Sequence, residues 1–260
     1  MYSHIVKNSF KTECIYKSQI YSKILYTILL YLIQMYIWEA VGMDEVETYN
    51  MRLYIILSSC ISIFIAYDTN YIPYFGEKII SGELGIYFCK PIDLRLNLFC
   101  EYMGTCIYRL LFNIFPMLIV FVWLNRGEVD SSKLFPVNIV YFAISGFMAI
   151  ILYFILSMCL GMLSFWVISI GNLHILLDST ITLFSGSIIP LWLIPNELLK
   201  IYEVLPFRYL YYYPISLGCG TSDMSFGFVV MHQLVWCVVL GLVSQILYKW
   251  GCTKFQDYGG

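Results

Sequence analysis

Six long apolar runs constrain the fold of this chain more than any other feature of its sequence. A helix that crosses the hydrocarbon core of a bilayer needs about 20 mostly apolar residues, and these runs reach or approach that length. Of the 260 residues, 60% are hydrophobic and 12% are charged, whereas an average soluble domain carries about 25% charged residues. We therefore expect an all-α integral membrane protein, with a single transmembrane domain over residues 1–260. Its six transmembrane helices are expected at residues 24–42, 53–73, 97–124, 138–168, 173–189 and 226–248.

The distribution of basic residues predicts how the chain crosses the membrane, because cytoplasmic loops are rich in Lys and Arg. Six crossings with both termini inside place nine of the 15 basic residues in cytoplasmic segments, five in external segments and Arg109 within a run. The polar and basic residues 1–22, before the first run, are typical of a short surface helix or a solvated tail. We therefore expect a multi-pass protein of the plasma membrane of a bacterium, with both termini in the cytoplasm.

Several motifs of enzymes and of nucleotide binding are absent from the sequence. It contains no G-x-x-x-x-G-K-[ST] phosphate loop, no H-E-x-x-H zinc motif and no G-x-S-x-G nucleophile motif. The nine cysteines include no C-x-x-C pair, and the net charge of −2 does not favour nucleic acid as a partner. We therefore expect no catalytic residue, no metal site and no cofactor on this chain. His174 and Asp178, one helical turn apart, are the only adjacent pair that a membrane enzyme acting on lipids could use.

A charged, glycine-punctuated segment at residues 74–95, the charged island, separates the second and third runs. Its apolar residues fall on one face at helical spacing, with charged residues opposite. Gly82 is suited to end this short helix, because glycine tolerates the left-handed backbone that follows many helices. Such a helix can lie flat on the membrane or insert into a groove of a soluble protein, and the two are compatible. Its apolar face begins with Ile72, Phe75, Ile79 and Ile80 and continues with Leu84, Tyr87 and Phe88.

Ionisable residues inside the apolar runs are costly in lipid and usually mark function or pairing. Arg109 falls near the middle of the third run, Asp68 toward the inner end of the second, and Asp178 on the inner half of the fifth. An ion pair between Arg109 and either aspartate would fix helix packing, whereas the same charges facing water would line a transport path. Both interpretations predict that Arg109→Leu impairs folding or transport and that Asp68→Asn or Asp178→Asn partly reproduces the defect.

The segment between the fifth and sixth runs, residues 190–225, does not have the composition of a simple loop. Pro190 and Pro195 are expected to stop the fifth span. After Pro206, an aromatic cluster around Arg208 suits the boundary between lipid and water. We expect an amphipathic helix or a re-entrant hairpin at the outer face, packed against other spans. A surface loop that dips into the headgroups is the alternative.

Two stretches of the sequence carry a family resemblance. Residues 81–93 read Ser-Gly-Glu-Leu-Gly-Ile-Tyr-Phe-Cys-Lys-Pro-Ile-Asp, and residues 205–209 read Leu-Pro-Phe-Arg-Tyr, ahead of Tyr-Tyr-Pro at 212–214. The first stretch resembles the G-x-L-(D/G)-x-x-L-x-(R/K)-P signature that follows the second span in permease subunits of type-2 ABC transporters. The later residues resemble the outer segment of the same family, before its last span. With the six-run layout, the resemblance covers nearly the whole chain.

The resemblance implies a six-span subunit that pairs with a second copy or a paralogue, among membrane lipids, and with a cytoplasmic ATPase subunit. The ATPase subunit would bind the ATP and magnesium, so that this chain needs no cofactor of its own. The charged island is similar to the coupling helix of the family, and residues 190–225 are similar to its outer gate. Contacts with the ATPase are then expected from Phe75, Glu77, Ile79, Ile80, Glu83 and Leu84. The gate would be shaped by Pro190, Pro195, Pro206 and Arg208.

Members of this family are generally exporters, which implies a function for this chain. We expect export of a hydrophobic or amphipathic compound, such as a drug, an antimicrobial peptide, a lipid or a glycan. The richness in tyrosine and cysteine, and Gly85 where many members carry an acidic residue, depart from the family pattern and leave the cargo open. The alternatives are a membrane-embedded enzyme that modifies lipids and a non-pumping immunity or scaffold protein. Capture of an ATPase subunit would separate the transporter from both.

Overall fold

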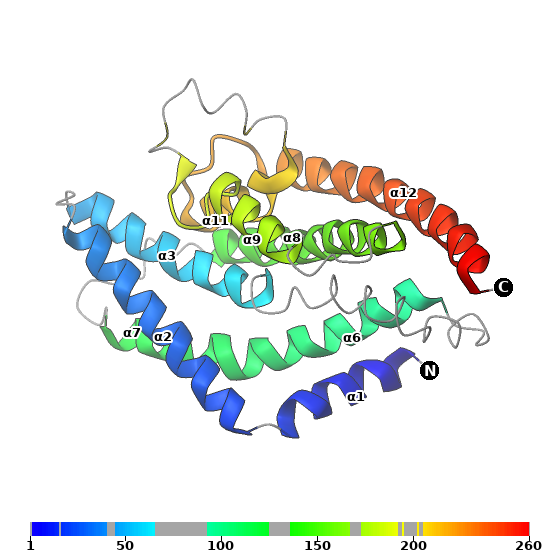
Figure 1. Ribbon diagram of the computed structural model, residues 1–260. Coiled ribbons are helices and arrows are strands. Elements are labelled where there is room, and N and C mark those ends of the chain that lie inside the picture. Colours follow the sequence, from blue (N-terminus) through cyan, green and yellow to red (C-terminus); the bar gives the residue numbers. More distant parts are fainter. Residues whose placement is uncertain are drawn as a thin grey trace. The chain divides into compact units, whose positions relative to one another are not determined.

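In the part of the chain that it describes, the computed structural model is helical apart from short turns and bends, with no strand among those residues (Figure 1). This architecture agrees with the predicted all-α class. The contacts within the chain divide it into two compact units. The first unit combines Met1–Phe64 with Ile92–Asn138, and the second combines Ile65–Pro91 with Ile139–Gly260. The structure describes residues 2–15, 17–40, 45–65, 93–124, 136–166, 173–191, 194, 202 and 205–259.

The first unit contains three long apolar helical stretches and one polar helix. Arg52, near the start of α3, forms an ion pair with Glu39 at the end of α2, with 3.5 Å between nitrogen and oxygen. The end of α2 and the start of α3 therefore lie together, as two successive crossings in opposite directions require. The elements are α1 (Tyr2–Ile15), α2 (Lys17–Ala40), α3 (Glu45–Ile65), α6 (Leu94–Arg109), the π-helix η1 (Leu110–Ile114) and α7 (Phe115–Leu124).

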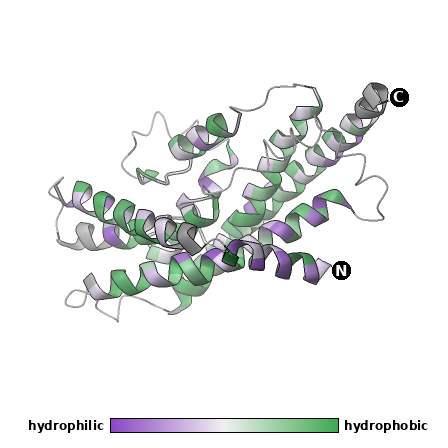
Figure 2. Ribbon diagram, turned by 60° about the horizontal axis from the view of Figure 1, so that its bottom comes forward, coloured by the Kyte–Doolittle hydropathy of each residue, from purple (hydrophilic) through white to green (hydrophobic). Residues whose placement is uncertain are grey.

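Helix α1 packs along α6, because Gly104 allows the two backbones to approach closely (Figure 1). A Cβ atom at Gly104 would lie 2.5 Å from the carbonyl oxygen of Val6 and 2.8 Å from Cβ of Ser9. The Ser9 hydroxyl donates a hydrogen bond of 2.8 Å to the carbonyl oxygen of Glu101. Figure 2 shows many hydrophilic residues on this first helix, near the N label. The N-terminal residues thus form a helix that contacts another helix, and the helix of the first run begins early, at Lys17.

The third run forms one helical stretch with a widened turn in it. Regular α-helix ends at Arg109, continues as the π-helix Leu110–Ile114, and resumes as α7. Pro116, in the first turn of α7, has no N–H to donate, and its ring excludes a carbonyl one turn earlier. A π-turn is one of the few ways in which a helix accommodates such an insertion without ending. The sequence predicted this stretch as a span at 97–124 without the widened turn.

The second unit is built on two helices that run in the same direction, α8 and α12. The rings of Tyr141 and Phe226 stack near the starts of the two helices, with 4.3 Å between their centroids. Phe165, just beyond the end of α8, packs directly against Gly251, near the other end of α12. The elements are α8 (Pro136–Met162), the 3-10 turn η2 (Leu163–Phe165), α9 (Leu173–Phe184), the 3-10 turn η4 (Pro206–Tyr209), α11 (Tyr212–Cys219) and α12 (Phe226–Gly259).

Helix α9 runs opposite to α8 and α12. Its last residue, Phe184, contacts Phe207 of η4, and the next carbonyl, that of Ser185, accepts a hydrogen bond of 3.1 Å from the amide of Tyr212. The side chain of Gln233, in the second turn of α12, in turn donates to the backbone of η4. Helix α9 therefore ends where α8 and α12 begin, and this alternation is what three successive crossings require.

Two helix ends in this unit differ from the predicted spans. Helix α9 ends at Phe184, before the predicted end at 189, because the chain turns at Gly186, whose φ of 79° is left-handed. The turn therefore precedes Pro190, which was expected to stop the helix. Helix α12 continues to Gly259, past the predicted end at 248.

Three described helices are long and apolar enough to cross a membrane: Leu94–Val120, Val137–Phe165 and Phe226–Thr253. Shorter apolar helices occupy the other three predicted runs: Ile24–Ala40, Met51–Ile65 and Ile175–Phe184. Large exposed apolar side chains line these helices, which would be unfavourable in water but suits lipid. On α12 they include Met231, Leu234, Val235, Val238, Leu242, Ile246 and Trp250.

Candidate functional site

Many of the residues predicted to act lie outside the described part of the chain. They include the residues expected to contact an ATPase, one aspartate of the expected ion pair and one proline of the expected gate. Their predictions are therefore untested by the structure. The residues concerned are Phe75, Glu77, Ile79, Ile80, Glu83, Leu84, Asp68 and Pro195. Arg109, Asp178, Pro190, Pro206 and Arg208 are described.

Arg109 is buried in the first unit, with 2% of its surface exposed, and its partners there include backbone oxygens. Its Nη1 donates to the carbonyl oxygens of Ile63 and Phe64, at 3.3 and 3.2 Å. The hydroxyl of Tyr102, two turns earlier on α6, donates to the same Phe64 oxygen at 3.0 Å. Arg109 and Tyr102 thus close the carboxyl end of α3, and we call these contacts the α3 clasp.

The α3 clasp meets a general need of helices in membranes. The last four carbonyls of a helix have no partner within that helix, and an unpaired backbone group in lipid costs several kcal/mol. A cation is also favoured at the carboxyl end of a helix, where the dipole is negative. The sequence predicted that Arg109 would pair with the carboxylate of Asp68 or Asp178 or face water, and this stays a prediction because Asp68 lies outside the described residues. The carbonyl partners of Arg109 were not anticipated, because these oxygens become available as acceptors only where α3 ends.

The start of α6 carries a polar closure of its own, just before the candidate span Leu94–Val120. The carboxylate of Asp93 accepts a hydrogen bond of 2.9 Å from the amide of Arg95 and caps the helix. The guanidinium of Arg95 pairs with the same carboxylate at 3.1 Å. Burial alone would raise the pKa of Asp93, but the hydrogen bonds and charge of Arg95 outweigh burial and hold this pKa below its ordinary value of 3.8.

Asn113 lies within the π-helix, and 2% of its surface is exposed. Within the described part of the chain, its side-chain oxygen Oδ1 accepts no hydrogen bond. A buried amide oxygen without a donor costs about 1–3 kcal/mol. The π-turn is therefore less stabilised than the regular helix before it.

The second unit has a buried polar junction at the amino ends of α8 and α12. Gln233, fully buried, donates from Nε2 to the carbonyl oxygens of Ser145 and Tyr209, at 3.0 and 2.9 Å. Its Oε1 accepts from the Ser145 hydroxyl at 3.2 Å. All of its bonds join different elements, so Gln233 ties η4 to both long helices. In the sequence, Gln233 is one polar residue in an apolar run, and no spacing pattern marks it.

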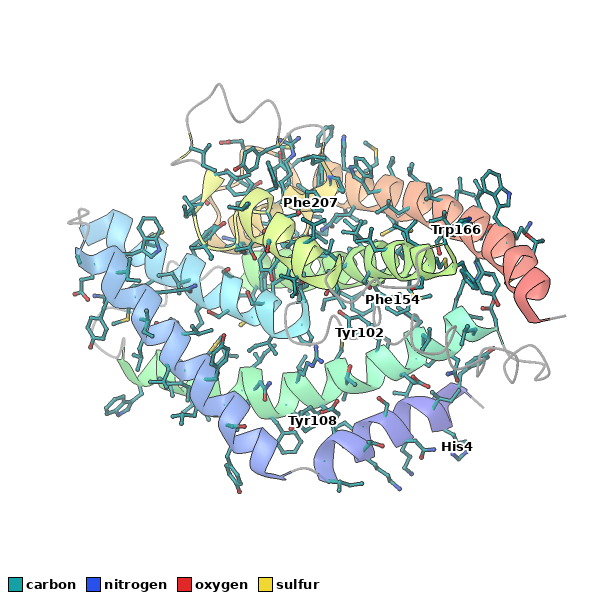
Figure 3. The ribbon with its side chains drawn as sticks, in the orientation of Figure 1. His4, Tyr102, Tyr108, Phe154, Trp166 and Phe207 are labelled. Atoms are coloured by element: carbon teal, nitrogen blue, oxygen red, sulfur yellow. The ribbon has the colours of Figure 1, made fainter. Side chains whose placement is uncertain are left out.

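Two predicted gate residues lie beside this junction, in η4. Pro206 is buried, and Phe207, next to it, contacts α9. The guanidinium of Arg208 lies over the rings of Tyr209 and Tyr213, at 5.4 and 5.1 Å from their centroids. Figure 3 labels Phe207 in this region. The structure thus places Pro206 and Arg208 in a packed aromatic cluster, and their part in a gate stays a prediction.

The remaining described predictions are placed separately. Pro190 is buried after the turn that follows α9. Asp178 is half-buried on α9, and its carbonyl oxygen accepts a hydrogen bond of 2.7 Å from the Thr182 hydroxyl. The expected ion pair with Asp68 lies outside the described residues. Asp178 and Arg109 belong to different units.

These observations define a class of protein: a multi-pass, all-helical membrane protein whose polar side chains close helix ends inside the apolar runs. Residues 24–259 match the model of the ABC-2 family transporter protein. The match covers most of the chain, so the chain belongs to this family and is a permease subunit of an ABC transporter. The predicted resemblance is thereby confirmed. No curated protein matches the chain.

Membership in the family carries two consequences. The chain is the membrane component of a transport system, a role that is generally not catalytic. It is also expected to work with an ABC ATPase component.

Proposed function

We propose that this chain is the six-span permease of an ABC exporter, driven by ATP that a separate cytoplasmic subunit hydrolyses. The observation that carries the proposal is the family match over residues 24–259. The alternating directions of α8, α9 and α12, and the ion pair between the ends of α2 and α3, support successive crossings. Both termini would then lie in the cytoplasm, and the chain would act as one transmembrane domain in the plasma membrane.

The charged island is the proposed site of contact with the ATPase. It joins α3 to α6, and with both termini inside, this connection lies on the cytoplasmic side. Its apolar face suits a groove in the ATPase, with Phe75, Ile79, Ile80 and Leu84 as anchors and with Glu77 and Glu83 beside them. ATP and magnesium would bind to the ATPase subunit alone.

The outer gate is proposed at η4 and α11, together with Pro190 and Pro195. The Gln233 junction would hold the gate against α8 and α12, and a second copy or a paralogue would complete the path. A hydrophobic or amphipathic cargo suits the aromatic residues around Arg208. We further propose that Asp68, Arg109 and Asp178 either line the transport path or fix the packing of the helices around it.

Affinity purification of the tagged chain from its own membranes in mild detergent tests this function. We expect a P-loop ATPase in the purified complex and ATP hydrolysis that vanadate inhibits. Inverted vesicles that contain the complex should accumulate a fluorescent lipophilic probe only when ATP is added. A monomeric chain without an ATPase would contradict the proposal and favour a lipid-modifying enzyme or a non-pumping immunity protein.

A further inference from the structure

The α3 clasp lies at the place where the chain enters the segment between α3 and α6. Helix α3 ends at Ile65, one residue after the carbonyl that Tyr102 and Arg109 share. Helix α6 begins at Leu94, capped by Asp93. The donors of the clasp, Tyr102 and Arg109, are therefore on α6, which follows the segment. Their acceptors are on α3, which precedes it.

The clasp is built to resist separation of the two helices. Tyr102 and Arg109 are 1% and 2% exposed, and three hydrogen bonds meet at two carbonyl oxygens. Hydrogen bonds from a charged donor are about twice as strong as neutral ones. Sliding α3 along α6 would leave a buried guanidinium and the last carbonyls of α3 with fewer partners, and both are costly away from water.

The helix is less constrained immediately beyond the clasp. The π-turn begins at Leu110, the residue after Arg109, and contains Asn113, whose amide oxygen accepts no hydrogen bond from the described residues. Pro116 then removes one backbone hydrogen bond. The rigid clasp is thus followed directly by a π-turn, whose hydrogen bonds can change at lower cost. Such π-turns inside α-helices are frequent at functional sites.

We propose that Arg109 and Tyr102 are positioning residues that make the end of α3 and the first half of α6 move as one body when the charged island is displaced. This inference rests on the proposed function, because it assigns a path to the motion that the ATPase would impose. The displacement would then be absorbed at the π-turn, beyond the clasp. A clasp with only a structural role would stabilise the fold without affecting how ATP hydrolysis is linked to motion.

Two tyrosines on α6 provide a matched pair for the test. Tyr102→Phe removes a hydroxyl that is bonded to Phe64, whereas Tyr108→Phe removes one that bonds to no other described residue. Both tyrosines are 1% exposed, and Tyr108 contacts Phe10 of α1 through its ring. Figure 3 shows the two side chains on different sides of α6. Arg109→Lys keeps the charge and is included because Arg109→Leu risks misfolding.

The experiment uses hydrogen–deuterium exchange on the complete complex in lipid nanodiscs, with and without ATP and vanadate, and measures ATP hydrolysis on the same samples. Tyr102→Phe should raise exchange in the last turn of α3 by about fivefold, the effect of one lost hydrogen bond. It should also reduce the nucleotide-dependent change in exchange at the π-turn, residues 110–114, by at least half, while ATP hydrolysis persists. Arg109→Lys should act in the same direction, and Tyr108→Phe should match the wild type.

The inference is overturned if Tyr102→Phe and Arg109→Lys transmit the nucleotide response as well as Tyr108→Phe does. It is also overturned if ATP hydrolysis falls in proportion to the response, because a purely structural defect lowers both. Failure of the proposed function is recognised separately, in the wild type alone, as absence of the ATPase or of any nucleotide response. If the wild type fails in this way, the proposed role of Arg109 and Tyr102 in transmitting motion is overturned together with the proposed function.

Discussion

Single polar side chains that satisfy helix ends are the most informative feature of this permease. Arg109 and Tyr102 close the end of α3, Asp93 closes the start of α6, and Gln233 ties η4 to two helices. Each of these side chains bonds to backbone atoms. In lipid such bonds matter more than in water, because the backbone has no other partner.

Gln233→Leu should loosen the outer segment without unfolding the long helices. The substitution leaves the carbonyl of Tyr209 and the Ser145 hydroxyl without this partner, and a loss of about 1–3 kcal/mol is expected. Exchange at residues 206–211 should rise, as measured by mass spectrometry in nanodiscs. Gln245→Leu, on the exposed side of the same helix, is the control and should change little. Equal effects of the two variants would argue against the junction.

Asp93→Ala should fray the first turn of α6. Loss of an N-cap costs about 1 kcal/mol, so amide exchange at residues 94–97 should rise about fivefold. Asp93→Asn is the control, because asparagine caps a helix nearly as well but cannot pair with the Arg95 charge. An increase in Asp93→Asn as large as in Asp93→Ala would show that the charge, rather than the cap, holds the turn.

The pH dependence of the Asp93 contribution follows from its lowered pKa. The contribution is complete above the ordinary value of 3.8 and is lost only as pH falls through the still lower pKa of the folded state. The difference in melting temperature between the wild type and Asp93→Asn should therefore stay constant from about pH 8 to about pH 5. A difference that disappears near pH 6 would contradict this assignment.

At the scale of helices, the packing of α1 against α6 is a contact that the sequence did not predict. Residues 1–22 predicted a surface helix or a tail, since their polar composition gives no sign of what they touch. The contact depends on the absence of a side chain at Gly104, which is one of 17 glycines. The apolar runs, in contrast, were predictable, because apolarity over about 20 residues is a local property.

Gly104→Ala should displace α1, because the new methyl group would meet the backbone of Val6, which cannot rotate away. Overpacking of this kind typically costs about 1–3 kcal/mol. Protease cleavage within α1 and its hydrogen exchange should both increase. Gly146→Ala on α8, where a Cβ meets nothing within 4 Å, is the control and should be neutral or slightly stabilising. Unchanged protection of α1 in Gly104→Ala would refute the close contact.

For the protein as a whole, the sequence predicted the class, the family and the positions of the apolar helices. Three features were missed. The end of α9 depends on the left-handed turn at Gly186, and α12 continues past Lys249 without a sequence signal for it. The π-turn depends on a single proline, Pro116. The prediction of a single transmembrane domain stays a prediction. The division into two compact units describes contacts within the chain and does not test it. The contact of the charged island with an ATPase was inferred from its apolar spacing and the family signature, and it stays a prediction.

The most direct test of this account is the amount of P-loop ATPase that co-purifies with the permease when the charged island is altered. Ile79→Asp and Leu84→Asp place charges on its apolar face, whereas Lys78→Gln changes the opposite face. We predict that the wild type and Lys78→Gln retain the ATPase in equal amounts, and that the two aspartate variants reach the membrane but lose it. Full retention by both aspartate variants would contradict the central claim that the island is where the ATPase acts.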